Sequence, residues 1–441
     1  MIKLLSLKST RHILTKSIFF ICIVLILCII SSNSYAQNKK IAIFGSSVAN
    51  GFGDTTTNGG YSGFIKKLLE KRGWTVVNVS KGGDNTIKIM PRYSGQLLPE
   101  KAKYVILGLS LGNEGIFSSS ETTRNRVLEQ YRSGMLRLIT MCREDGMIPY
   151  ITNCYARNDF ESPHYEATKR MNLIINTWDV PSMNALGTID NGKGNWVEGF
   201  SYDKLHPNVL GHKEIFFAFV PSIFDAMEAG KKVPYKVKRT NYLHLVNNSS
   251  SSPLTYTPED TIPSFAVSFL VKSSSFGTIA AVAGAKNGCG IAFVNNKIQY
   301  LSNSGVQLSG DTTQTNNGWI YVVLSHQWAS GTTSLYVNGS LCGQTKEKTD
   351  FKQFILGGNG DNQKLPFSIK EAKFKDLLIY RSSLNSDEAK ALYYDQLLQS
   401  SLEIYAPFND LVYNNGSATN NFAQSLSRLM INSTGLTMEQ E

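Results

Sequence analysis

The sequence predicts two domains: an α/β domain with a doubly wound, mainly parallel sheet, followed by an antiparallel β-sandwich. Three observations support this prediction. The chain has 441 residues, more than a single hydrophobic core usually serves. From residue 39 to about residue 232, short apolar runs alternate with amphipathic stretches, which is typical of a parallel sheet covered by helices. After residue 233 the pattern changes to short β-type runs separated by Gly, Asn and Ser, as in a sandwich.

Residues 1–36 have the features of a secretory signal peptide. Four basic residues precede an apolar run at residues 18–30, and Ser34 and Ala36 supply the small residues of a cleavage site. The apolar run is short for a membrane span. We therefore expect a secreted or periplasmic protein with no stable membrane span after cleavage. An uncleaved anchor is the alternative.

Charge and cysteine content narrow the possible partners. The whole chain carries a net charge of +10, and residues 1–36 contain four basic and no acidic residues, so the mature protein carries +6, spread along its length. Without a basic block that contains aromatic residues, nucleic acid is not an expected partner. Cys142, Cys154, Cys289 and Cys342 lack metal-ligand or redox spacing, so no metal or other cofactor is expected. Export permits disulfides, and both bridges and buried free thiols remain open.

The first domain is predicted to cover residues 37–232. Its strands are expected at residues 41–44, 76–79, 104–107 and 148–152, where each run is nearly continuously apolar, as in a parallel sheet buried on both faces. Helical spacing of apolar residues predicts helices at residues 64–72 and 127–139, with a further helical run at 209–227. In such a sheet, functional loops lie at the carboxyl ends of the strands.

The second domain is predicted to cover residues 254–434, after a linker at 233–253 that contains Pro234 and a serine tract. Residues 435–441 are expected to form a frayed tail. One late helix, at 386–397, begins with a capping pattern formed by Asn385 and Glu388. The β-type runs include residues 265–271, 320–325, 334–337 and 377–380.

Three residues of the first domain have the chemistry of a serine nucleophile with its base. Ser47 follows the first strand directly, in a glycine-containing turn. Asp203 precedes His206 by three residues, close enough in one loop for its carboxylate to orient the imidazole. The sequence thus predicts a catalytic triad of Ser47, Asp203 and His206.

Two further positions can donate hydrogen bonds to a developing oxyanion. Gly83 follows the second strand, where its backbone N–H is free to face the site, and Asn113 follows the third strand with a side-chain amide. Either residue can instead serve only its local turn. Lys81, Lys88 and Arg92 are interpreted as solvated surface charges.

These residues together resemble the SGNH (GDSL-like) hydrolases, which have a flavodoxin-like fold. The family places a serine after strand one, a glycine after strand two, an asparagine after strand three and a late Asp-x-x-His. This chain reads GSSVANG, NVSKGGDNT, LGNEG and DKLHPNVLGH at those places. The resemblance implies Ser47 as nucleophile, Asp203 and His206 as its partners, and an oxyanion hole formed by Ser47, Gly83 and Asn113. The chain departs from the family's pattern at two positions: Ser46 stands in place of the family's aspartate, and Glu114 in place of the aspartate after the asparagine.

Two other serines compete for the nucleophile's role. Ser46 adjoins Ser47 and differs from it only by its place in the motif. Ser110 lies in Gly108-Leu-Ser-Leu-Gly112, which matches the nucleophile elbow of α/β-hydrolases. An elbow requires a helix directly after its serine, and residues 112–115 are predicted to be a loop, which argues against Ser110.

The second domain resembles the laminin-G/concanavalin A-like jelly-roll modules of bacterial carbohydrate-active enzymes. The resemblance rests on SLYVNG at 334–339, FILGG at 354–358 and DLLIYR at 376–381. It implies a β-sandwich and leaves a glycan ligand and a spacer or docking role equally open. Trp319 and Trp328 are assigned to the core rather than to a sugar platform. Calcium ligation and an ordinary turn are both open for Asn359, Asp361 and Asn362.

The sequence therefore predicts an exported serine esterase that works through an acyl-enzyme, as a carbohydrate O-acetylesterase on acetylated polysaccharide. A lipase or thioesterase is the enzymatic alternative. A non-catalytic glycan-binding protein is the alternative from another class. The sugar, the acyl group and the oligomeric state cannot be read from the sequence.

Overall fold

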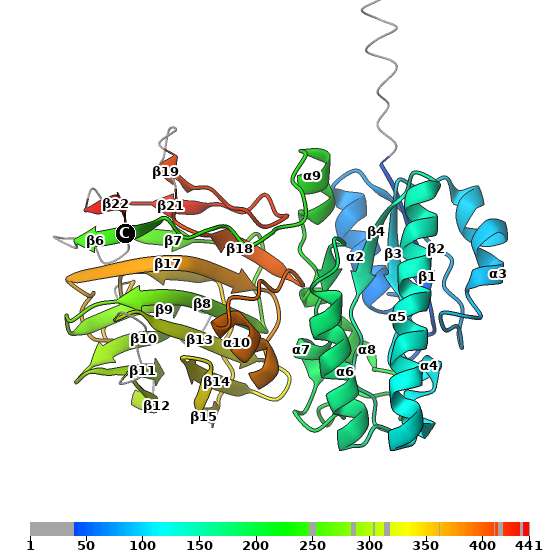
Figure 1. Cartoon of the computed structure of the whole chain (residues 1–441), viewed down its shortest axis with the longest axis horizontal. Coiled ribbons are helices and arrows are strands. Elements are labelled where there is room, and N and C mark those ends of the chain that lie inside the picture. Colours follow the sequence, from blue (N-terminus) through cyan, green and yellow to red (C-terminus); the bar gives the residue numbers. More distant parts are fainter. Residues whose placement is uncertain are drawn as a thin grey trace, which may run out of the picture. The chain divides into compact units, whose positions relative to one another are not determined.

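A five-stranded parallel sheet forms the centre of the first domain in the computed structural model (Figure 1). Its order is β2-β1-β3-β4-β5, which places the reversal of strand order next to β1, where ligand sites of open α/β sheets occur. The predicted fold class is confirmed, and each predicted strand is present. The strands are β1 (Lys40–Gly45), β2 (Thr75–Asn78), β3 (Tyr104–Gly108), β4 (Ile148–Thr152) and β5 (Ser182–Met183).

The structure describes residues 39–246, 253–283, 288–302, 305–312, 318–360, 362–409, 411–412, 418–432 and 435–440. The predicted signal peptide lies outside these residues. Within them, none of the helices combines the length and the hydropathy needed to cross a bilayer. Lys40–Glu441 forms one compact unit.

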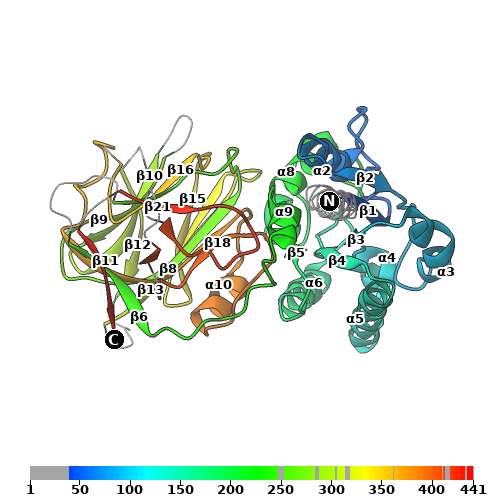
Figure 2. The same cartoon turned by 90° about the horizontal axis from the view of Figure 1, so that it is seen from above.

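Helices cover both faces of the parallel sheet (Figure 2). Apolar residues of α2 (Gly60–Lys71), α8 (Val209–Phe217) and α9 (Ile223–Glu228) pack on one face. Residues of α5 (Glu121–Glu144) and α6 (Ser162–Ile175) pack on the other. The helical run predicted at 209–227 is broken between α8 and α9, where Pro221 lacks an N–H and disfavours a helical residue before it. The remaining α-helices of this domain are short: α3 (Met90–Arg92), α4 (Leu111–Glu114) and α7 (Leu186–Ile189).

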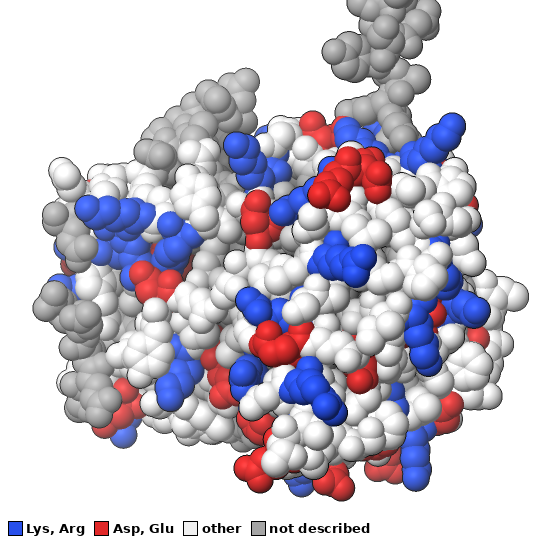
Figure 3. Space-filling view, turned by 45° about the vertical axis from the view of Figure 1, so that its right-hand side comes forward, with Lys and Arg blue, Asp and Glu red and all other residues white. Residues whose placement is uncertain are grey.

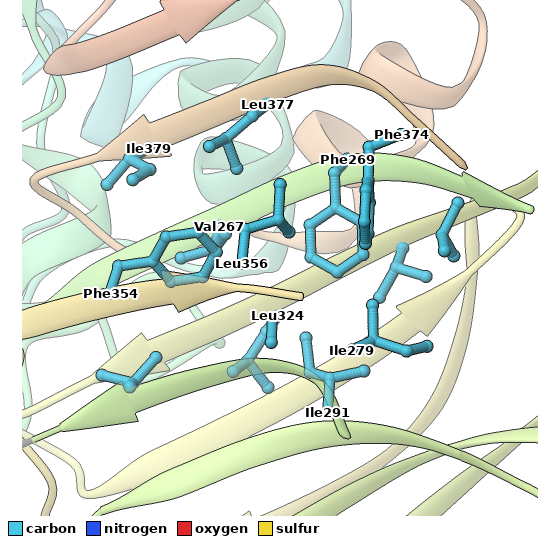
Figure 4. Packing of buried hydrophobic residues seen from close by; sticks show 14 of the residues in the cluster. Val267, Phe269, Ile279, Ile291, Leu324, Phe354, Leu356, Phe374, Leu377 and Ile379 are labelled. Carbon is cyan, nitrogen blue, oxygen red and sulfur yellow. The ribbon is translucent and has the colours of Figure 1, made fainter. Parts of the chain in front are cut away.

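The second domain is an antiparallel sandwich of two sheets within the described residues. Buried side chains from both sheets, among them Phe269, Ile291 and Phe354, form its core (Figure 4). One sheet has the order β12 (Gly305–Asp311), β11 (Lys297–Ser302), β10 (Cys289–Val294), β9 (Gly277–Ala283), β16 (Gln353–Leu356), β7 (Leu254–Tyr256), β21 (Leu429–Ile431), β20 (Ala418–Thr419), β19 (Leu411–Val412). The other has β15 (Ser340–Lys346), β14 (Thr332–Val337), β13 (Ile320–Gln327), β8 (Phe265–Lys272), β17 (Glu371–Tyr380), β6 (Asn241–Val246) and β22 (Leu436–Gln440), with β18 (Leu402–Ala406) paired to β17. The predicted capping pattern begins α10 (Ser386–Tyr393), which ends four residues earlier than predicted.

Two segments outside the predicted sandwich belong to it. β6 lies in the predicted linker, and β22 lies in the predicted frayed tail. The tail prediction was wrong because β22 pairs with β6 along its whole length and buries Leu436 in the core. The linker boundary was placed too late because Leu243 and Leu245 of β6 also belong to that core.

The second domain also completes the edge of the parallel sheet. The backbone N–H of Ser401 donates to the carbonyl oxygen of Ser182 in β5 at 3.0 Å. Nearby, the side-chain oxygen of Asn176 accepts hydrogen bonds from the N–H groups of Gln399, at 2.8 Å, and Ser400, at 3.0 Å. All these groups are buried, so the junction between the domains is a polar seam rather than a free linker.

The tryptophans and cysteines singled out in the sequence contact other residues of the fold. Trp328 packs against the core of the first domain, and the ring of Trp319 makes an edge contact with Tyr242. The four cysteines among the described residues are free thiols, and three of them are buried, which favours free thiols over bridges. Asp361 of the possible calcium site lies outside the described residues. On the face shown in Figure 3, basic and acidic side chains are interspersed.

Candidate active site

The turn after β1 separates the two adjacent serines. The N–H of Ser46 donates to the carbonyl oxygen of Gly108 in β3 at 3.0 Å, and its side chain is only 1% exposed. Ser47 is the more accessible of the two, and its Oγ lies 3.0 Å from Nε2 of His206. The structure thus brings Ser47, and not the buried Ser46, into hydrogen-bond contact with the predicted base.

A tight turn holds Asp203 against His206. One carboxylate oxygen of Asp203 accepts the backbone N–H groups of Leu205, at 2.7 Å, and His206, at 2.8 Å. Nδ1 of His206 lies 3.0 Å from both carboxylate oxygens. Partial burial acts to raise the pKa of Asp203, but the hydrogen bonds from His206 and Leu205 outweigh it and lower the pKa below its ordinary value. The carboxylate is therefore ionised and can orient the imidazole with Nε2 toward Ser47.

Aromatic side chains surround the imidazole of His206. The ring of Phe52 lies 4.4 Å from it, and Tyr202 contacts Phe52 edge-on at 6.0 Å. Phe52 is 52% exposed and Tyr202 is 54% exposed, so both rings remain open to a substrate beside the serine. The sequence interpretation missed both residues, although each lies within five residues of a predicted triad member.

His212 holds the backbone of Phe52 in place. It is fully buried; its Nε2–H donates to the carbonyl oxygen of Phe52 at 3.0 Å, and its Nδ1 accepts the N–H of Tyr61 at 3.2 Å. Burial lowers the pKa of His212 to about 4. A neutral imidazole with this tautomer holds the backbone of Phe52 so that its ring lies against His206.

The loop after β2 lies beside Ser47. The N–H of Lys81 donates to the carbonyl oxygen of Gly45 at 3.0 Å, which ties this loop to the turn of the serine. Gly83 has φ of 79°, a conformation that favours glycine. A Cβ placed on Gly82 would lie 3.8 Å from Cβ of Ser47. Gly82 is therefore near the serine, and the role of the adjoining Gly83 as an oxyanion donor stays a prediction.

Asn113 lies on α4 and is tied to the same loop. Its side-chain Nδ2 donates to the backbone carbonyl oxygen of Asp84 at 3.0 Å. The backbone carbonyl oxygen of Asn113 accepts a hydrogen bond from Nδ2 of Asn85 at 3.2 Å. An amide nitrogen has two protons, so one remains for a substrate. The next residue, Glu114, is buried and accepts the N–H and hydroxyl of Thr86. Burial raises its pKa.

Arg92 is not a solvated surface charge. It forms an ion pair with the buried carboxylate of Asp84 and donates to the carbonyl oxygen of Val79. Arg92 thereby holds the start of the loop and the residue that follows Gly83. The sequence interpretation failed because a lone arginine on a short helix gives no signal of its partner in an adjoining loop.

Arg157, which follows β4, is a further residue that the sequence interpretation missed. Its guanidinium is paired with Asp159 at 2.6 Å, lies over the rings of Phe117 and Phe160, and reaches within 3.5 Å of Oδ1 of Asn113. Arg157 is only 5% exposed. Since the carboxyl end of every parallel strand faces the same edge, residues 153–160 were the place to search.

Ser110 is followed by a helix, contrary to the prediction of a loop at 112–115. Residues 111–114 form the single turn of α4, for which Ser110 is the N-cap position. Ser110 is nevertheless buried, and its Oγ accepts the N–H of Tyr155 at 3.4 Å. It therefore has a structural partner, whereas Ser47 has the imidazole.

Comparison with known proteins identifies both domains. Residues 43–214 match the GDSL-like lipase/acylhydrolase family, a range that includes every residue of the predicted site. The first domain is thus similar to members of this family. Residues 247–390 match the Concanavalin A-like lectin/glucanases superfamily, so the chain joins a GDSL-like hydrolase domain to a lectin-like sandwich. No curated protein matches the chain significantly.

Several solved structures resemble part of the chain at low identity. A Bacteroides ovatus protein, named as a candidate carbohydrate binding protein, is 14% identical with a TM-score of 0.35, over 46% of this chain and 60% of that one. This chain thus spans less than two thirds of that protein. A pentraxin from Limulus polyphemus is 14% identical with a TM-score of 0.33, over 46% and 97%. A catalytic mutant of Axe2, an acetylxylan esterase from Geobacillus stearothermophilus, is 13% identical with a TM-score of 0.31, over 40% and 90%. Scores this low carry no argument about the substrate.

Proposed function

We propose that the GDSL-like domain is a serine esterase with Ser47 as nucleophile. The observation that supports this most directly is the chain of contacts from Oγ of Ser47 through the imidazole of His206 to the carboxylate of Asp203, each at 3.0 Å. A serine hydroxyl is a weak nucleophile, and an adjoining oriented imidazole activates it. The hydrolase family of the domain is consistent with this chemistry.

The reaction proceeds in two halves. Oγ of Ser47 attacks the ester carbonyl carbon while Nε2 of His206 accepts the hydroxyl proton, and Asp203 stabilises the imidazolium. The carbonyl oxygen becomes an oxyanion that accepts hydrogen bonds from the N–H groups of Ser47 and Gly83 and from the amide of Asn113. The tetrahedral intermediate collapses, and the alcohol leaves with the proton from His206. Water then attacks the acyl-serine by the same route and releases the acid.

We infer that the substrate is an O-acetylated polysaccharide and that the protein is exported. Phe52 and Tyr202 offer exposed rings beside the imidazole, and the flat faces of aromatic rings can pack against the C–H groups of a sugar ring. The second domain matches a lectin/glucanase superfamily, and residues 1–36 have the composition of a signal peptide.

A second candidate is a long-chain acyl ester. The same exposed rings, with Leu205 and Leu210 at 39% and 54% exposure, provide apolar surface for an acyl chain. A series of p-nitrophenyl esters from acetyl to lauryl separates the candidates, because an acetylesterase loses kcat/KM as the chain lengthens and a lipase gains it.

The test of the esterase uses the chain from Gln37 onward. The parent and its Ser47→Ala variant are compared on p-nitrophenyl acetate and on acetylated polysaccharides by acetate release, with Ser46→Ala and Ser110→Ala as matched controls. We expect activity to disappear only with Ser47→Ala. Activity that survives Ser47→Ala would reject Ser47 as nucleophile. A parent that binds glycans but cleaves no ester would instead support a binding protein.

A further inference from the structure

A groove of about 710 Å³ lies where α6, α7 and the loop after α7 face β13, β14 and β15. Both domains contribute to its wall, all within the compact unit Lys40–Glu441. Hydrogen bonds fix the two walls relative to each other: Asn184 Nδ2 donates to the buried Glu388 at 2.9 Å, and the N–H of Ser383 donates to the carbonyl oxygen of Gly187 at 3.2 Å. The groove therefore has walls that hydrogen bonds hold at a fixed separation.

The sheet wall of the groove carries hydroxyl and amide groups. Leu324 of β13 and Leu335 of β14 point into the sandwich core, so their sequence neighbours on these strands occupy the opposite face. That face presents Ser325, Gln327, Ser334 and, on β15, Gln344 to the groove. The hydroxyl of Ser325 is already bonded to the backbone of Leu384, and Gln344 donates to Ser334 at 2.9 Å. The amide of Gln327 and the remaining donors and acceptors of Gln344 and Ser334 are therefore the groups that can bond a ligand.

Gln327 stands out among them. It is only 8% exposed and lines the groove, yet its side-chain amide has no hydrogen bond to another described residue. Its amide atoms are not among the fully buried polar atoms that lack a partner, so they are open to the space of the groove and can bond a ligand there. A bound molecule with hydroxyl groups would satisfy it.

The charges of the groove are balanced. Glu166, Asp190 and Glu198 oppose Lys169, Lys193 and Lys346 along the lining. Lys169 is already paired with Glu166 at 3.0 Å and with Asp387 at 2.8 Å. Asp190 accepts the hydroxyl of Tyr165. A lining with equal numbers of acidic and basic side chains does not select an anion or a cation, whereas its amides and hydroxyls suit a neutral polyhydroxyl ligand.

The groove adjoins the loop that carries Asp203 and His206. Val197 and Glu198, earlier in this loop, line the groove. Glu198 and Asp203 are five residues apart, so their Cα atoms are separated by at most about 18 Å. One extended polymer can thus lie in the groove and still reach Ser47.

We propose that this interdomain groove binds a neutral stretch of a polysaccharide chain and holds the polymer while an acetyl group on it reaches Ser47. This proposal rests on the proposed esterase function for the link to Ser47, but not for binding. The sandwich then supplies part of the substrate site of the hydrolase domain rather than a separate anchor.

Binding is tested directly with full-length mature protein that carries Ser47→Ala, by titration calorimetry against acetylated and deacetylated xylan and glucomannan oligosaccharides. Gln344→Trp fills the groove, Gln327→Ala removes the unpartnered amide, and Ser340→Trp places the same ring on β15 outside the lining. We expect at least one oligosaccharide family to bind, at least tenfold weaker binding with Gln344→Trp and Gln327→Ala, and unchanged binding with Ser340→Trp. Failure of every oligosaccharide to bind, or equal binding by all variants, overturns the proposal.

Turnover by the enzyme with Ser47 intact separates the groove from the esterase. We expect Gln344→Trp to leave kcat/KM on p-nitrophenyl acetate unchanged, which also shows that the variant folds, and to raise KM on the acetylated polymer at least fivefold. An unchanged KM on the polymer would reject the groove while the esterase stands. A parent that does not hydrolyse p-nitrophenyl acetate would reject the esterase, and the calorimetry would still decide the groove.

Discussion

Gly112 makes room for Arg157, and the substitution Gly112→Ala tests how firmly that arginine is held. A Cβ on Gly112 would lie 2.3 Å from Nη1 and 2.5 Å from Cδ of Arg157. Both contacts are far below van der Waals distance. Arg157 has little freedom to move, because Asp159 binds its guanidinium through two nitrogen atoms and Phe117 and Phe160 lie against it.

The cost follows from these contacts. Forcing a methyl group into a filled site costs about 1–3 kcal/mol, and moving the guanidinium from two rings costs about 1 kcal/mol or more. Alanine in place of glycine in a helix returns about 1 kcal/mol. We therefore expect Gly112→Ala to lower the free energy of unfolding by about 1–3 kcal/mol. We also expect kcat/KM on p-nitrophenyl acetate to fall, because the displaced guanidinium lies beside Asn113.

Urea denaturation of the parent, of Gly112→Ala and of a matched control measures the cost. Gly95→Ala is the control, since a Cβ there meets nothing within 4 Å and the variant should be neutral or slightly stabilised. In an Arg157→Ala background the obstacle is gone, and Gly112→Ala should cost nothing. An equal penalty with and without Arg157 would refute the reasoning, and so would a Gly112→Ala variant as stable as the parent.

Three further predictions concern other contacts of the structure. Asn113→Ala should lower kcat on p-nitrophenyl acetate by about 10²–10³-fold with little change in KM, because an oxyanion donor acts in the transition state; an unchanged kcat would remove Asn113 from the oxyanion hole. The pKa of His212 falls from 6.5 to about 4 on burial, so from pH 6.5 down to 4 the unfolded chain binds a proton that the folded chain does not. Folding stability should decrease across this window by up to about 3 kcal/mol, and His212→Gln should flatten that part of the curve in denaturation experiments at several pH values. Asn176→Ala leaves two buried N–H groups without an acceptor and should cost about 2–4 kcal/mol in urea denaturation, whereas exposed Asn125→Ala should cost under 0.5 kcal/mol.

The sequence was most informative where a short segment decides the outcome. β1, β3 and β4 are nearly continuous apolar runs because helices cover both faces of their sheet, and continuous runs are visible in the sequence. Asp203 and His206 lie in one turn, so their contact follows from a spacing of three residues. The place of Ser47 after β1 follows from topology alone.

Long-range polar contacts were not predictable. No periodic pattern in the sequence announces the hydrogen bond from Ser401 to Ser182 or the approach of Arg157 to Asn113. The same is true of β22, whose partner β6 lies almost two hundred residues earlier. The single turn of α4 was missed because helical periodicity becomes visible in a sequence only when it repeats over more than one turn.

The edge of the parallel sheet has a consequence for how this protein can be divided. β5 has two residues, and its outer side is bonded by residues 399–401 of the second domain. A fragment that stops at residue 232 would expose that strand edge, and the buried amides of Asn153, Asn176 and Asn184 would lose acceptors or donors. Such an edge invites pairing with another chain. The two domains therefore cannot be exchanged independently. A chimera in which either domain is replaced by a relative would also need matching residues at positions 399–401 and along β5.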